Sequence, residues 1–177
     1  MCKYFFTLRS HNSIFIIMES TLFEYHKQKT IQALRYHFIS RKEIKVMMIL
    51  VNVFALLTAA MFFFKKISPL AFLTSSIMWF LMMLLFWFIL PRLVYRKSAM
   101  FKDSFKVRLD DDTLTLYNEK ASRSWDWSSF SYWMETPHFF HLYFNQRSFL
   151  IFPKDAFLEE VETFARNSFK KHIGNKA

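Results

Sequence analysis

Glycine and cysteine are almost absent from this sequence. Its 177 residues contain 1 Gly and 1 Cys. A single glycine excludes glycine-rich phosphate-binding loops and predicts that few backbone sites need a positive φ angle. A single cysteine, Cys2, excludes an intrachain disulfide, which suits a reducing compartment. The sequence also lacks an Asn-x-Ser/Thr acceptor, so nothing in it indicates a glycosylated face.

Charged residues are missing from two long stretches, Val46–Phe64 and Ile67–Leu90. At about 1.5 Å rise per residue, the nineteen residues of the first span roughly 29 Å as a helix, the thickness of a bilayer's hydrocarbon core. The second stretch is longer still, and only Lys65 and Lys66 separate the two. We therefore predict two transmembrane helices, at 46–64 and 70–91, joined by an external turn at 65–69. Without an ionisable group inside either span, a transporter, pump or sensor core is disfavoured.

Basic residues gather beside these two stretches. The formal net charge is +10. Eleven basic residues flank the hairpin, namely Lys27, Lys29, Arg35, Arg41, Lys42, Lys45, Arg92, Arg96, Lys97, Lys102 and Lys106, whereas two lie at its tip. The positive-inside rule then predicts that both termini are cytoplasmic and that the tip is external. This placement also argues against a nucleic-acid-binding surface.

Eight of these residues form the predicted membrane collar, which we expect to contact anionic headgroups of the lipid bilayer. They are Lys27, Arg35, Arg41, Lys42, Lys45, Arg92, Arg96 and Lys97.

Small residues are spaced four apart on both spans. Ala55 and Ala59 lie on the first helix, and Ala71 and Ser75 lie on the second. In an antiparallel hairpin the two pairs come level, so we predict that they pack the helices together. By the same register Asn52 lies near Met78 and Trp79. Its amide either bonds across the helices or bonds to its own backbone or interfacial water.

The N-terminal region contains no segment long enough to span a membrane. We assign residues 1–20 to an N-terminal lead. Its residues 1–17 are either disordered or the product of an over-long start, with Met18 as the alternative first residue. Residues 21–45 follow, with a short strand at 21–25 and a basic amphipathic juxtamembrane helix at 26–45. Its apolar stripe contains Ile31, Leu34 and Phe38. We expect this helix to lie in the membrane interface, the alternative being that it packs on the soluble domain.

Pro91 is predicted to end the second span, and a basic connector follows at 92–104. After the connector, the spacing of apolar residues changes to the period of two that is typical of strands. Short stretches with strand character alternate with brief polar turns, as in an antiparallel sheet or barrel. The predicted strands are 105–109, 114–117, 123–127, 130–134, 139–144 and 149–152. Asp155–Lys171 is a predicted helix with one apolar stripe, formed by Phe157, Leu158, Val161, Phe164, Ala165 and Phe169. The fold class is therefore a membrane α-helical hairpin followed by a small α+β domain, an antiparallel sheet capped by a C-terminal helix.

Four parts of the soluble region are distinctive, namely Trp125-Asp-Trp127-Ser-Ser-Phe130, Glu135, Phe139-Phe-His-Leu-Tyr-Phe144 and Phe149-Leu-Ile-Phe-Pro-Lys-Asp-Ala-Phe157. Through these residues the soluble part resembles the YcxB-like membrane proteins of bacteria. The resemblance implies a PH-like domain over residues 105–172, on the cytoplasmic side of a bacterial inner (plasma) membrane. The family supplies no established catalytic residue or ligand to carry over.

The polar residues point to no catalytic, cofactor or metal site. His138 and His141 are three apart on a predicted strand, so they face opposite sides and make a poor metal pair. The run Asp110–Asp112 lacks the glycine and glutamate of a calcium loop. Trp125 and Trp127 share one face, either as core residues or as an aromatic binding surface. We therefore expect no enzyme activity, no cofactor and no small-molecule substrate.

Two functions remain open. The chain is either a membrane protein that presents a binding module to a cytoplasmic protein, or a structural subunit that assembles through its hairpin with itself or with a larger membrane complex.

Overall fold

The computed structural model describes residues 6–10 and 13–174, and they form two compact units. The hairpin unit is Lys27–Ser98, and the sheet unit combines Met1–His26 with Ala99–Ala177. The sequence analysis placed the soluble domain at residues 105–172 alone. That boundary is too narrow, because the segment before the hairpin belongs to the same unit. The hairpin is thus inserted into the sheet unit.

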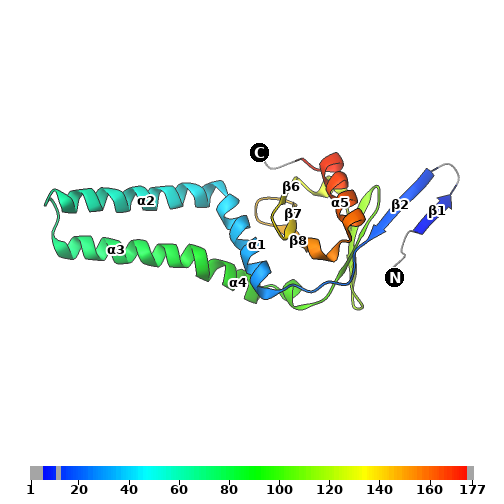
Figure 1. Cartoon of the computed structure of the whole chain (residues 1–177), viewed down its shortest axis with the longest axis horizontal. Helices are drawn as coiled ribbons and strands as arrows, with labels where there is room; N and C mark the ends of the chain where they lie inside the picture. Colours follow the sequence, from blue (N-terminus) through cyan, green and yellow to red (C-terminus); the bar gives the residue numbers. More distant parts are fainter. Residues whose placement is uncertain (1–5, 11–12, 175–177) are drawn as a thin grey trace. The chain divides into compact units, whose positions relative to one another are not determined.

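The hairpin unit is helical throughout (Figure 1). Its elements are α1 (Lys27–Ser40), α2 (Lys42–Phe63), α3 (Pro69–Leu84), the π-helical segment η1 (Leu85–Ile89) and α4 (Leu90–Lys97). Two continuous helices, Lys42–Phe63 and Pro69–Lys97, are long and apolar enough to cross a membrane. Both membrane-length helices are therefore confirmed. The first starts four residues earlier than predicted and ends one residue earlier, and the second extends six residues beyond its predicted end.

The predicted helix over 26–45 is broken after Ser40. The Ser40 hydroxyl donates to the backbone oxygen of His37 at 2.8 Å, and Arg41 has an extended backbone with φ −76° and ψ 130°. A serine that bonds to a nearby backbone carbonyl competes with helical hydrogen bonding. The break starts α2 at Lys42, ahead of the predicted Val46.

The tip of the hairpin uses local capping. Ser68 precedes α3 and its side chain accepts from the backbone N–H of Ala71, with Pro69 in the first turn. At the end of α2, Lys65 has φ 55°, the only positive φ among the described residues. The N–H of Lys66 donates to Met61 O, and the N–H of Lys65 donates to Phe62 O. This is the Schellman pattern, with lysine in the place that glycine usually takes.

Pro91 does not end the second helix as predicted. The chain passes through the π-helical segment η1 and continues as α4, with Pro91 in its first turn. A proline inside an α-helix clashes with the carbonyl four residues earlier and removes a donor. The wider π turn relieves this crowding locally, and the first part of the predicted connector 92–104 is helical as a result.

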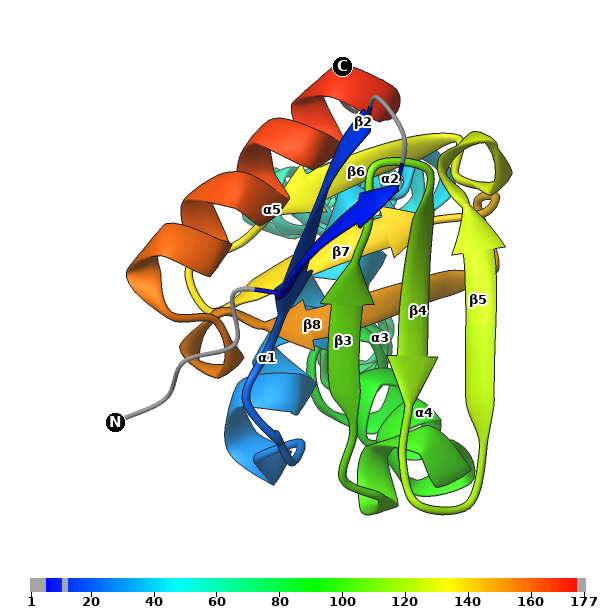
Figure 2. The ribbon, with the colours of Figure 1, turned by 90° about the vertical axis from the view of Figure 1, so that its right-hand side faces the viewer.

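The sheet unit contains two antiparallel sheets and a C-terminal helix (Figure 2). One sheet has the order β1-β2-β3-β4-β5, and the other has the order β6-β7-β8. The strands are β1 (Phe6–Ser10), β2 (Ser13–Glu19), β3 (Lys106–Leu109), β4 (Thr113–Tyr117), β5 (Ser122–Asp126), β6 (Tyr132–Glu135), β7 (Phe139–Tyr143) and β8 (Phe149–Pro153). All six strands predicted after the hairpin are present, within two residues at each end.

The N-terminal lead contributes to this sheet. The prediction of a disordered lead is wrong for β1 and β2; residues 1–5 and 11–12 lie outside the described residues. Met18 pairs with Leu109, and Glu19 pairs with Arg108, which joins β2 to β3 across the insertion. The strand predicted at 21–25 is reduced to one bridge, between Phe23 and Phe105.

Helix α5 (Glu159–His172) lies beside β2 and β6 and closes the core (Figure 2). Phe169 is fully buried and packs on the rings of Trp127, Trp133 and Phe140. The predicted stripe is only partly right. Leu158 precedes the helix and is 55% exposed, and Phe164 is half-buried. The helix starts four residues later than predicted, because Lys154–Ala156 forms a separate 3-10 turn.

Candidate interaction surfaces

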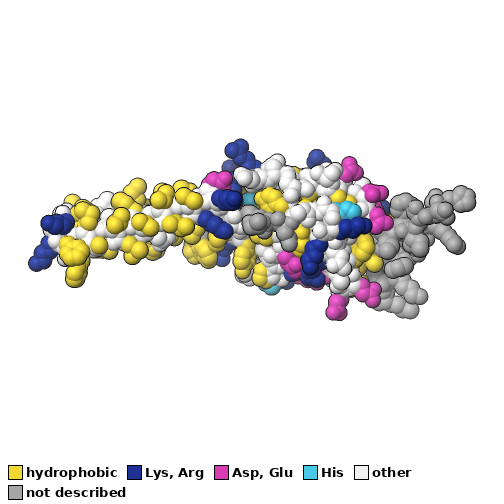
Figure 3. Space-filling model, turned by 90° about the horizontal axis from the view of Figure 1, so that it is seen from above, with side chains coloured by type: hydrophobic (Ala, Val, Ile, Leu, Met, Phe, Trp, Pro, Cys, Tyr) yellow, Lys and Arg dark blue, Asp and Glu magenta, His cyan; other side chains and the backbone are white. Residues whose placement is uncertain are grey.

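The eight collar residues lie on three helices of the hairpin unit or on the link between two of them. Lys and Arg side chains mark both ends of the hairpin, and hydrophobic side chains cover the length between (Figure 3). Six of the eight are exposed, whereas Arg35 and Arg41 are half-buried. In α1 the stripe residues Ile31 and Leu34 are buried. That burial favours packing on protein over the predicted position of α1 in the membrane interface.

Arg35 is the collar residue with the most extensive contacts. Its guanidinium carbon lies 5.4 Å from the ring centres of both Trp87 and Phe88. Arg92 approaches the same Phe88 ring at 5.6 Å. Cation–π contacts of this kind stabilise a charge beside apolar surface. Arg35 therefore has a structural role in addition to its predicted contact with lipid.

The predicted helix-packing residues gather at one groove between α2 and α3. Ala55, Ala59 and Ser75 line this groove, which has a volume of about 550 Å³, whereas Ala71 is exposed and does not line it. Beside them, Trp79 Nε1 donates to Asn52 Oδ1 at 3.4 Å, and Asn52 Nδ2 donates to Met48 O at 2.7 Å. The sequence analysis gave a bond across the helices and a bond to the backbone of its own helix as alternatives for Asn52. The structure contains both bonds.

The two tryptophans of the strand signature have different environments. Trp127 is buried, donates through Nε1 to Asp110 O at 3.1 Å and stacks on His172. Trp125 is half-buried on β5, where the Arg123 guanidinium lies 5.2 Å from its ring. The first is a core residue. The second remains available as part of an aromatic surface on β5, which is the last strand in the order of the five-stranded sheet.

Glu135 is the centre of an ion-pair network that local sequence patterns did not reveal. It accepts from Lys154, and from Arg166 Nη2 at 2.9 Å, while Arg166 also pairs with Glu162 at 2.6 Å. These hydrogen bonds, Arg166 first, lower the pKa of Glu135 from 4.5 to about 2. Glu135 and Glu162 together raise the pKa of Arg166. The network joins three elements: β6, the 3-10 turn that follows β8, and α5. Lys154 lies 19 positions and Arg166 lies 31 positions after Glu135 in the sequence.

The segment before the hairpin is anchored by its side chains. Tyr25 is buried, its hydroxyl donates to Ile151 O at 2.9 Å, and burial raises its pKa well above the usual range. Thr21 Oγ1 donates to Ala156 O at 2.9 Å. No sequence signal marked these residues as part of the domain, since their partners lie more than a hundred positions away.

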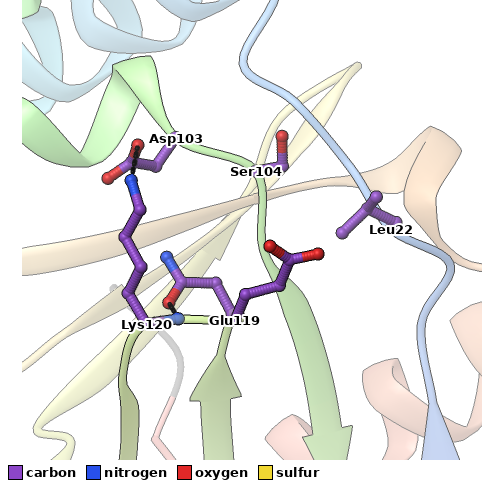
Figure 4. Close-up of a pocket in the computed structure, with 6 residues that line it drawn as sticks. Leu22, Asp103, Ser104, Glu119 and Lys120 are labelled. Atoms are coloured by element: carbon purple, nitrogen blue, oxygen red, sulfur yellow. Dashed lines mark hydrogen bonds and ion pairs between the residues drawn. The ribbon is translucent and has the colours of Figure 1, made fainter.

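A shallow pocket of about 240 Å³ opens on the sheet unit (Figure 4). Its lining combines Leu22, Asp103, Ser104, Asn118, Glu119 and Lys120. Lys120 reaches Asp103 at 3.9 Å, and its backbone N–H donates to Asn118 Oδ1 at 2.9 Å. The lining is mixed in charge, and its residues Asp103, Asn118 and Lys120 bond to one another. This arrangement is typical of a solvated loop junction.

Within the described residues, no group of three or more His, Cys, Asp or Glu side chains is placed to hold a metal ion. His141 is fully buried in β7, with Nε2 3.3 Å from Thr136 Oγ1, whereas His138 is exposed in the turn before that strand. The absence of a metal, a cofactor and an enzyme activity stays a prediction.

Residues 109–166 match the family model described as YcxB-like protein. This stretch of the chain is therefore similar to YcxB-like proteins. The match runs from the last residue of β3 into α5, and it includes all four stretches on which the resemblance was based. No curated protein and no solved structure matches the chain. The sheet unit that contains the matched residues also includes β2 and the segment 20–26, which lie outside the match.

Proposed function

We propose that this protein is an integral membrane protein of the bacterial inner membrane that presents its YcxB-like domain to the cytoplasm as a PH-like module for binding another protein. The hairpin unit supplies the anchor through its two membrane-length helices. Two antiparallel sheets with a C-terminal helix support the PH-like fold that the family resemblance implies.

The distribution of charge between the two units carries this proposal. Residues 27–98 contain 11 Lys/Arg and one acidic residue, Glu43, which gives +10. The rest of the chain contains 13 Lys/Arg and 13 Asp/Glu, which gives a net charge of zero. A surface that reads anionic lipid headgroups needs a basic surplus. The surplus belongs to the anchor alone, which favours a protein partner for the YcxB-like domain.

The strand pairing supports the predicted topology independently of the charge rule. β2 precedes the hairpin, β3 follows it, and they pair in one sheet. Both ends of the hairpin must therefore lie on the same side of the membrane, which two crossings achieve. Together with the basic flanks, this pairing supports a cytoplasmic position for the YcxB-like domain.

Reporter fusions test the membrane part. A reporter after Ala177 should be active in the cytoplasm, and one inserted between Lys65 and Lys66 should be active outside. An external Ala177 would reject the proposal.

The binding part is tested with the full chain in lipid nanodiscs, and a chain reduced to residues 27–98 serves as the control. We expect cytoplasmic protein to be retained only when the YcxB-like domain is present. Vesicles rich in anionic lipid provide the opposing test. If the domain bound them tightly and lost this binding on charge reversal of Lys106 and Arg108, lipid recognition would replace protein binding as the function.

A further inference from the structure

The hairpin presents two grooves of different chemistry. Ser75 and Trp79, at the contact between α2 and α3, contribute to both. The larger groove, which we call the amide groove, is also lined by the small or polar residues Asn52, Ala55, Thr58, Ala59 and Ser76, and by the bulky residues Leu56, Phe72 and Phe80. The smaller, of about 310 Å³, is also lined by Leu50, Val51, Phe54, Met78 and Met82. At 100° per residue, Asn52 and Ala59 fall on one side of the helix contact, and Leu50 and Phe54 fall on the other.

We propose that the amide groove binds the hairpin of a second copy of this chain. The proposal rests on the proposed membrane insertion. In a bilayer, helices associate through small residues and interhelical hydrogen bonds, whereas bulky apolar side chains pack equally well against lipid. Small and polar residues are concentrated in the amide groove. The opposite groove has the composition of a lipid-facing surface.

Asn52 identifies the partner. It lies 6 residues after Val46, where the uncharged stretch Val46–Phe64 begins, and its side chain is exposed. That position is inside the hydrocarbon core, where water is absent. Within the described residues its amide uses one N–H, towards Met48 O, and accepts one long bond from Trp79.

The amide of Asn52 therefore retains one N–H and part of its acceptor capacity for a bond to another chain. A group that offers a donor and an acceptor together is complementary to itself across a two-fold axis. A second copy supplies that match at the same depth in the membrane, with its own Ala55 and Ala59 beside it.

Disulfide cross-linking in lipid vesicles tests this contact. Cys2 is the only cysteine, so Cys2→Ser gives a clean background. Leu56→Cys reports on the amide groove, and Leu50→Cys is its matched control on the other groove, since these leucines are 71% and 62% exposed. We expect a Leu56→Cys dimer that persists as lipid is added. The Leu50→Cys signal should fall with dilution.

Substitutions within the groove provide a second measurement. Asn52→Leu should weaken dimerisation about fivefold, the factor that one interhelical hydrogen bond in a membrane confers. Ala59→Leu, which fills the groove without removing the amide, should also weaken it, while Val51→Leu on the opposite groove should not. Equal cross-linking at both reporters, or association unchanged by both groove substitutions, would overturn the proposal.

Carbonate extraction separates this inference from the proposed function. A chain that stays in the membrane but remains monomeric contradicts the dimer alone. A chain that carbonate releases contradicts the membrane anchor, and the dimer with it.

Discussion

Arg35 donates a hydrogen bond through Nε to the backbone oxygen of Trp87 at 3.0 Å. In an α-helix that oxygen would accept from residue 91, but Pro91 has no N–H. The guanidinium supplies the missing donor from α1, and it stacks on the rings of Trp87 and Phe88 at the same time. One arginine thus joins α1 to the irregular part of the second membrane-length helix.

Replacing Arg35 should therefore destabilise the hairpin unit. Arg35→Met keeps the length of the side chain but removes the donor and the charge. We expect a loss of about 1–3 kcal/mol, the range for a hydrogen bond to a charged group. Thermal unfolding of the full chain in detergent measures it. Arg92→Met is the control, because Arg92 is exposed and its one contact among the described residues is with the Phe88 ring.

A double-mutant cycle tests the cause. Pro91→Ala restores an N–H that can donate to Trp87 O, so Arg35→Met should cost less in the Pro91→Ala background than in the native chain. If the two effects simply add, Arg35 does not compensate for the proline.

Stability should decrease in acid through Glu135. Its pKa is lowered from 4.5 to about 2 in the folded protein. A lowered pKa contributes stability that is fully present above pH 4.5 and is lost as the pH falls towards 2. Since 31% of the Glu135 side chain is exposed, solvent screening limits this contribution to about 1 kcal/mol.

Glu135→Gln should lower the stability of the full chain at pH 7 and remove this part of its acid dependence. Chemical unfolding between pH 2 and pH 7 measures both effects. Glu160→Gln, an exposed change on α5, is the control. If Glu135→Gln kept the native slope between pH 4.5 and pH 2, the network would not be responsible.

The sheet unit is formed by two separate parts of the chain, so we expect only fragments that contain both parts to fold. Residues 99–177 lack β2 and the buried side chains of Phe23 and Tyr25. We expect this fragment to aggregate, because the matching apolar surface is left uncovered. Residues 1–26 joined to 99–177 by a flexible Gly/Ser linker should fold. Dispersion of amide NMR signals distinguishes the two results.

A shorter fusion examines the alternative start. Residues 18–26 joined to 99–177 keep Met18 and Glu19, the two β2 residues that pair with β3, and also keep Phe23 and Tyr25. This fusion should fold as well. A well-dispersed spectrum from 99–177 alone would contradict the split domain.

Within α5, substitution of Phe169 should cause the largest loss of stability. Phe169→Asp places a charge in a site with 0% exposure, so it should unfold the sheet unit, at a cost of at least about 3 kcal/mol. Phe164→Asp should have a smaller effect, because Phe164 is only half-buried. Unfolding of the full chain with denaturant compares them. Equal effects would show that α5 does not close the core through Phe169.

Local patterns in the sequence predicted much of this structure. The two uncharged stretches, the six strands after the hairpin and the C-terminal helix depend on runs and periods within a few residues, and each is present. The sequence also predicted that Asn52 lies near Trp79. In an antiparallel hairpin, residues at equal distances from the tip lie opposite each other, so the pair follows from counting residues back from Lys65.

Three features depended on contacts between distant residues. The pairing of Met18 with Leu109, the network around Glu135 and the bond from Arg35 to Trp87 each join positions from 19 to 91 residues apart. The spacing of apolar residues along the sequence does not predict such contacts. The sequence analysis assigned no strand to residues 13–19, and β2 joins the sheet through its pairing with β3. The sequence by itself determined most of the elements and the charge of the hairpin unit. The tertiary structure decided that the hairpin unit is inserted within the sheet unit, since hydrogen bonds between strands form only when the chain returns to the same sheet.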